Sequence, residues 1–246
     1  FNEALGFHKI KISTFFMIIL FTFLVMPLVT VLNALSMFFT DNAIASMQDD
    51  IVGVSFVVMW FLIGIYGPFC EEFVFRGVLY RGYKTSGKII GAVLLSSLSF
   101  GLMHMNLNQA LYAFAIGIFL AMLVEAAGSL WASVFCHMIF NSIQVCMMFL
   151  SDWMVDVFYG GELGDMQETL TNESLMAAMS VYLVIAAVTT PIAVCVLAWI
   201  VKNENRVEIV RNLHRREGEA GGYLLSIPFI VALVLCLGFI SLEFIL

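Results

Sequence analysis

The sequence predicts an all-α fold, a polytopic membrane bundle of about seven transmembrane helices, and two observations lead to it. Of the 246 residues, 62% are hydrophobic and only 12% are charged, whereas a soluble domain has about 45–50% apolar and about 25% charged residues. Apolar runs of about 18 residues or more, long enough to cross a bilayer as helices, recur along the whole chain. The strands of a membrane β-barrel would instead alternate over about 10 residues, so the sequence favours a helical bundle.

Each expected span is an apolar run bounded by polar connectors. The first run is too long for a cleavable signal peptide, so we expect it to remain as a span. No soluble domain or internal repeat interrupts the series, and we therefore expect one integral-membrane domain over residues 1–246. The expected spans are 12–39, 52–82, 89–105, 109–126, 129–150, 175–201 and 222–246.

The lysines and arginines predict the orientation of these spans. All 11 of them fall before the first span, at the end of the second, or in the connector 202–221, and with seven spans these places share one side of the membrane. The connectors 40–50 and 151–174 on the other side carry acidic residues but neither Lys nor Arg. Because cytoplasmic loops are enriched in Lys and Arg, we expect the N-terminus in the cytoplasm and the C-terminus outside.

The same features predict the surroundings of the protein. We expect a multi-pass protein of the cell membrane in contact with the lipid bilayer, and no nucleic-acid partner. The small size and the short connectors favour a bacterial source. The sequence does not indicate an oligomeric state.

Ionisable side chains inside spans are costly, so each is a candidate functional residue. Two of them, Glu125 and Glu243, lie near the ends of spans, and we interpret these as interfacial. Leaving out the basic residues at the predicted cytoplasmic rim, the set consists of Glu71, Glu72, Arg76, His104, Glu125, His137 and Glu243, with Asn141 as an amide companion.

The two adjacent glutamates are expected to have different roles. Glu72 and Arg76 are four residues apart, which places them on one helical face with the acid on the favourable N-terminal side. Glu71 has Val74 and Phe75 at the corresponding positions, so it has no local counter-charge. We therefore expect Glu72 to be neutralised by Arg76, and Glu71 to be available as a general base or acid.

Two chemistries fit Glu71 together with the histidines. In the first, Glu71, His104 and His137 hold a divalent metal such as zinc, with water in the open position. In the second, Glu71 and His104 polarise water directly, while His137 and Asn141, four residues apart, donate hydrogen bonds to an oxyanion. The sequence contains neither HExxH nor a serine in a GxSxG setting, so it lacks the motifs of the common soluble zinc and serine hydrolases.

Three segments together resemble a known family. EEFVFRG (71–77), FGLMH (100–104) and HMIFN (137–141) are similar to the EExxxR, FxxxH and HxxxN motifs of the CAAX-protease and bacteriocin-processing (Abi-type) intramembrane proteases, which include the type II CAAX prenyl endopeptidases. The resemblance covers a catalytic core of about 67–145. It implies hydrolysis of peptide bonds in a peptide or membrane-anchored protein substrate, in settings such as prenyl-protein maturation, bacteriocin processing or immunity.

The resemblance also implies roles for the site residues. Glu71 would activate water with the assistance of His104, His137 and Asn141 would stabilise the oxyanion, and the pair Glu72 and Arg76 would support the site. We expect no obligatory metal, because neither histidine has an evident carboxylate partner of its own. Zinc held by Glu71, His104 and His137 is the alternative.

This function has a geometric requirement and two competitors. Glu71 can meet His104 only if the second span continues as a tilted helix to about Lys84, which would place Glu71 well inside the membrane, and we expect the cavity to open toward the cytoplasm. A proton-coupled transporter is the first alternative, although the chain shows no repeat of the kind many transporters have. The second is a catalytically silent scaffold or immunity protein.

Overall fold

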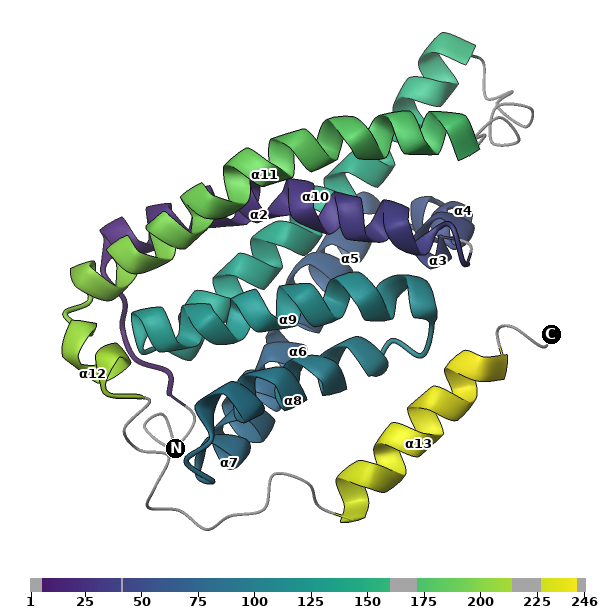
Figure 1. Cartoon of the computed structure of the whole chain (residues 1–246). Helices are drawn as coiled ribbons and strands as arrows, with labels where there is room; N and C mark the ends of the chain where they lie inside the picture. The colour runs from purple at the N-terminus through teal and green to yellow at the C-terminus, as the bar shows by residue number, and fades with distance from the viewer. Residues whose placement is uncertain (1–5, 41, 160–171, 214–226, 243–246) are drawn as a thin grey trace.

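The computed structural model describes residues 6–40, 42–159, 172–213 and 227–242, and all regular structure in these ranges is helical (Figure 1). Successive long helices run back and forth between two ends of the bundle, so that helices far apart in the sequence lie side by side. The predicted all-α class is therefore confirmed.

Among the described residues, five helices are long and apolar enough to cross a membrane. They are α2 (Ile12–Ser36), a composite helix over Phe56–Lys84, α9 (Leu107–Ala127), α10 (Leu130–Tyr159) and α11 (Asn172–Asn203). Two further apolar helices, α8 (Ile89–Leu102) and α13 (Ile227–Leu242), have 14 and 16 residues, fewer than the about 20 that a span usually needs. All seven predicted apolar segments thus contain a helix, and α8 is shorter than the predicted span 89–105.

The composite helix Phe56–Lys84 changes its hydrogen-bonding pattern along its length. Its parts are α5 (Phe56–Met59), the π-helical segment η1 (Trp60–Tyr66), α6 (Gly67–Glu72), the π-helical segment η2 (Phe73–Tyr80) and α7 (Arg81–Lys84). π-helical stretches are rare and occur frequently at functional sites. The helix continues to Lys84 as expected, which places α6 near its middle. The remaining short helices are α3 (Ala43–Ser46), α4 (Gln48–Val52) and α12 (Val207–Arg211).

A buried apolar cluster joins α2, α9, α10 and α11. Its fully buried members include Phe21 on α2, Leu120 and Leu123 on α9, and Ile200 on α11. Spanning helices are apolar on every side, because their outer faces contact lipid. Hydrophobicity alone therefore does not show which face of each helix enters this cluster.

Small residues bring α8 close to α9. A Cβ atom added to Gly117 of α9 would lie 2.9 Å from the Cβ of Ser97, and one added to Gly101 of α8 would lie 2.6 Å from the carbonyl oxygen of Ala110. Both distances are too short for carbon, so these positions require glycine. Such close approach is typical of helix pairs in membranes, and it fixes the end of α8 that carries His104.

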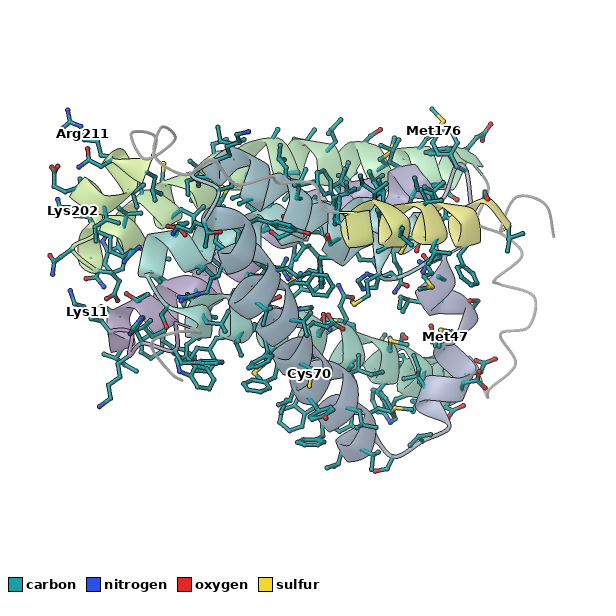
Figure 2. All side chains as sticks on the ribbon, turned by 90° about the horizontal axis from the view of Figure 1, so that it is seen from below. Lys11, Met47, Cys70, Met176, Lys202 and Arg211 are labelled. Carbon is teal, nitrogen blue, oxygen red and sulfur yellow. The ribbon has the colours of Figure 1, made fainter. Side chains whose placement is uncertain are left out.

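Basic side chains gather at one end of the bundle. Lys11, Lys202 and Arg211 lie at this end in Figure 2, and Met47 and Met176 lie at the opposite end. We call these the basic end and the α3–α4 end. The distribution agrees with the sequence pattern, but the side of the membrane that the basic end faces stays a prediction.

Glu125 lies near the basic end but is only 8% exposed. Its Oε1 accepts a hydrogen bond from the hydroxyl of Tyr80 at 2.9 Å and pairs with Lys84, and Arg206 Nη2 lies 3.9 Å from its Oε2. Glu125 thus lies near the end of its helix as expected, but side chains from two other segments cover it, which the interpretation as an interfacial residue did not include. Glu243, the other residue interpreted as interfacial, lies outside the described residues.

Candidate active site

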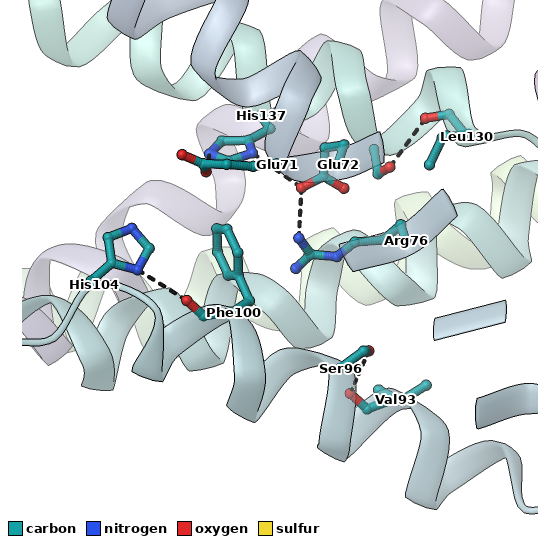
Figure 3. A network of polar contacts seen from close by, with 10 residues as sticks. Glu71, Glu72, Arg76, Val93, Ser96, Phe100, His104, Leu130 and His137 are labelled. Atoms are coloured by element: carbon teal, nitrogen blue, oxygen red, sulfur yellow. Dashed lines mark hydrogen bonds and ion pairs between the residues drawn. The ribbon is translucent and has the colours of Figure 1, made fainter. Parts of the chain in front are cut away.

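The three sequence motifs meet in the middle of the bundle (Figure 3). Glu71 and Glu72 end α6, Arg76 lies on η2, His137 lies on α10, and His104 follows the last turn of α8. These residues approach one another because α10 packs against α6 while η2 packs against α8. The second and third motifs thereby lie on either side of the first.

Glu72 joins two of the motifs. Its Oε1 accepts a hydrogen bond from Arg76 Nη1 at 2.7 Å and another from His137 Nδ1 at 3.1 Å, and the side chains of Glu72 and Arg76 are fully buried. The expected Glu72–Arg76 pair is thus present. The contact with His137 was not predicted. Because an ionised carboxylate only accepts hydrogen bonds, Nδ1 of His137 carries the proton in this contact.

Glu71 has a different environment from its neighbour. Its side chain is 28% exposed, and its Oε2 lies 3.7 Å from Nε2 of His137. This distance exceeds that of a hydrogen bond, so the two groups face each other without being locked together. The structure therefore pairs Glu71 with His137 more directly than with His104, while leaving the Glu71 carboxylate accessible.

Phe100 organises both histidines, a role that sequence reasoning missed. Its ring meets the rings of His104 and His137 edge to face, at centroid separations of 5.3 and 5.6 Å. The guanidinium carbon of Arg76 lies 4.4 Å from the same ring centroid, within the range of a cation–π contact. The backbone oxygen of Phe100 also accepts a hydrogen bond from His104 Nδ1 at 3.0 Å. The FxxxH motif thus has a physical reason for its phenylalanine.

Asn141 and Ser142 hold α10 against η1. Asn141 Nδ2 donates a hydrogen bond to the carbonyl oxygen of Ile63 at 3.1 Å. The hydroxyl of Ser142 donates to the carbonyl oxygen of Gly64 at 3.4 Å. A Cβ at Gly64 would lie 2.9 Å from the Ser142 hydroxyl oxygen, so glycine permits the approach. One amide hydrogen of Asn141 is thereby engaged, and its second amide hydrogen remains for another acceptor.

The four candidate catalytic residues line one cavity of about 470 Å³. The side chains of Asn42 and Ile44 line it near the α3–α4 end of the bundle. The side to which the cavity opens depends on how the helices are rotated, and the expected cytoplasmic opening stays a prediction.

The structure bears on the metal alternative in two ways. The Nδ1 atoms of both His104 and His137 contact acceptors, as the second ring nitrogen of a metal-bound histidine usually does, so one reason for expecting no metal is weaker than the sequence suggested. However, among the described residues no group of three or more His, Cys, Asp or Glu side chains is arranged to hold a metal ion. Glu71, His104 and His137 do not converge as ligands here, and metal dependence stays untested.

The part of the chain that carries the three motifs is similar to known proteins. Residues 53–143 match the family model described as type II CAAX prenyl endopeptidase Rce1-like. The resemblance to the CAAX proteases is confirmed over this segment. The segment contains all three motifs and the elements from α5 through the first half of α10.

One curated relative matches over a segment of similar length. The Bacillus subtilis (strain 168) protein named "Putative membrane peptidase YdiL" is 30% identical over 90 residues, which are 37% of this chain and 37% of that protein. The match thus spans little more than a third of either chain. No solved structure matches this chain. The expectation of a single domain over residues 1–246 stays a prediction.

Proposed function

We propose that this protein is an intramembrane endopeptidase that hydrolyses peptide bonds of a peptide or membrane-anchored protein. The placement of Glu71 carries the proposal: a carboxylate in the middle of a spanning helix, open to a cavity, beside a histidine whose other nitrogen is fixed by a buried ion pair. The family match and the relative named as a membrane peptidase support the same reaction class.

In the proposed reaction Glu71 is the general base. It removes a proton from a water molecule in the cavity, and the oxygen of that water attacks the carbonyl carbon of the substrate. The carbon–nitrogen bond then breaks, and the proton held by Glu71 passes to the leaving amine. His104 suits the role of positioning this water, because its Nδ1 donates to the Phe100 carbonyl and its Nε2 is therefore an acceptor in the neutral ring.

The oxyanion of the tetrahedral intermediate needs hydrogen-bond donors. The second amide hydrogen of Asn141 is one candidate. His137 can donate from Nε2 only as an imidazolium, because its Nδ1 proton is already directed at Glu72. The carboxylates of Glu71 and Glu72 lie on the two sides of the ring and would balance that charge. The buried ion pair thus acts as a positioning group for His137.

The test is hydrolysis by the purified, liposome-reconstituted protein of a pool of random-sequence peptides, with products identified by mass spectrometry. Glu71→Gln is expected to lower the cleavage rate by about 100- to 10,000-fold, since an amide cannot take the proton from water. Cleavage at the wild-type rate by Glu71→Gln would rule out this base. In a parallel sample, cleavage is expected to survive a zinc chelator, and its loss would show that a metal is required.

A further inference from the structure

The cavity that holds Glu71 is lined by uncharged polar side chains as well as by apolar ones. Besides the catalytic candidates, its uncharged polar side chains come from α2, the start of α3, α9 and α10. Of the described residues that line it, none is Lys, Arg or Asp, and Glu71 is the one carboxylate. These uncharged polar residues are Thr30, Asn33, Asn42, Gln109, Tyr112, Asn141 and Gln144.

Three of these carboxamides have their oxygen atoms engaged by neighbours. Oδ1 of Asn33 accepts from Asn108 at 2.9 Å, and Oε1 of Gln109 accepts from Asn106 at 2.5 Å. Oδ1 of Asn42 accepts from the first backbone N–H groups of α3. These three side chains therefore offer an occupant their remaining amide N–H groups, whereas Asn141 and Gln144 offer both donors and acceptors. Donors of this kind match the carbonyl oxygens of a polypeptide backbone.

The same lining disfavours other occupants. A saturated or isoprenoid chain has no acceptors, so it would desolvate the amide groups without replacing their hydrogen bonds, which costs free energy for each group. An anionic headgroup or a free C-terminal carboxylate would find no Lys or Arg among the described lining residues. The cavity volume of about 470 Å³ lies within the range of about 300–1,000 Å³ that is usual for ligand sites.

We propose that the carboxamide wall binds the backbone carbonyls of an internal, extended and uncharged stretch of the substrate polypeptide. Gln109 and Gln144 are the specificity-determining residues, facing the peptide beside Glu71. This inference rests on the proposed endopeptidase function and adds the class of substrate to it. It is also consistent with apolar residues such as Ile63, Phe140 and Met148 in the same lining, which would contact uncharged substrate side chains.

The experiment measures binding separately from cleavage. Fluorescence anisotropy follows a labelled ten-residue peptide with uncharged side chains as it binds to the full chain in detergent micelles, in the wild-type and Glu71→Gln backgrounds. Gln109→Leu and Gln144→Leu are each expected to weaken binding about tenfold, the effect of losing one hydrogen bond to a buried carbonyl. Gln48→Leu, the same substitution on α4 outside the lining, is the matched control and is expected to bind normally.

Two further probes test the chemistry of the occupant. The same peptide carrying two Lys or two Asp residues is expected to bind at least about tenfold more weakly, and an isoprenoid alcohol is expected not to compete. Any of four results would overturn the inference. These are equal binding by all three glutamine variants, equal binding of the charged peptides, displacement of the peptide by the isoprenoid alcohol, and no binding of the neutral peptide. Because Gln144 is exposed, its variant keeps the test valid even if Gln109→Leu fails to fold.

Failure of the inference can be told apart from failure of the proposed function. Peptide binding that depends on Gln109 and Gln144, without cleavage by the wild type, would leave the carboxamide site in place and remove the endopeptidase proposal. Cleavage that depends on Glu71 but not on either glutamine would support the endopeptidase proposal and remove the carboxamide site.

Discussion

Two clusters of charged side chains contact the composite helix Phe56–Lys84, and they differ in their balance of acidic and basic groups. Near the basic end, the single carboxylate of Glu125 faces Tyr80, Lys84 and Arg206. In the middle of the helix, two adjacent carboxylates lie near a single arginine, Arg76. The ion pair with Arg76 is formed by Glu72. The excess carboxylate, Glu71, faces a cavity. A carboxylate without a cation of its own, open to a cavity, indicates a catalytic role. A carboxylate surrounded by hydrogen-bond donors, such as Glu125, indicates a structural role.

The largest effect expected from this comparison concerns stability. Arg76→Met leaves Glu72 buried without a cation, which should lower the free energy of unfolding by about 3–5 kcal/mol. Lys84→Met at the other cluster should cost less than about 1 kcal/mol, because Lys84 is 30% exposed and Arg206 remains near Glu125. Denaturant unfolding in detergent micelles measures both. Equal losses would show that the two clusters do not differ in the proposed way.

The next effect concerns the ring that separates the two histidines. Phe100→Leu removes the edge-to-face contacts with both of them, and the resulting misplacement should lower kcat by about 10- to 100-fold with little change in KM. Phe75→Leu is the matched control, since Phe75 packs on Phe100 at 5.3 Å. If the two variants are equally slow, Phe100 contributes packing and not the position of the histidines.

The smallest effect on cleavage is expected at Glu125. Glu125→Gln keeps the shape of the side chain but removes its charge, so the protein should lose about 1–3 kcal/mol of stability and retain wild-type cleavage per folded molecule. Thermal unfolding and a peptide-cleavage assay on the same sample provide both values. A large loss of cleavage with unchanged stability would assign Glu125 to the chemistry and remove the distinction between the clusters.

Local features of this protein could be predicted from sequence because they depend on one or two helical turns. The apolar runs predict the spans, and the four-residue separation predicts the Glu72–Arg76 contact. That contact is present even though Arg76 lies in the π-helical segment η2, where backbone hydrogen bonds join residues five apart. The length of the arginine side chain makes the pairing tolerant of this change in helical geometry.

Contacts between helices could not be predicted in the same way. The Glu72–His137 hydrogen bond joins residues 65 positions apart, and it depends on how α6 and α10 are rotated. Uniformly apolar helices carry little amphipathic signal to indicate that rotation. The burial of Glu125 was missed for the same reason. The small residues at Gly64, Gly101 and Gly117 were the one available signal of close packing.

The central claim is that Glu71 performs chemistry and Glu125 does not, although both are carboxylates in spanning helices. The most direct measurement compares the cleavage rates of Glu71→Gln and Glu125→Gln on one peptide substrate, each normalised to the folded protein in the sample. The account predicts a rate reduced by at least about 100-fold for Glu71→Gln and a wild-type rate for Glu125→Gln. Comparable rates for the two variants would contradict it.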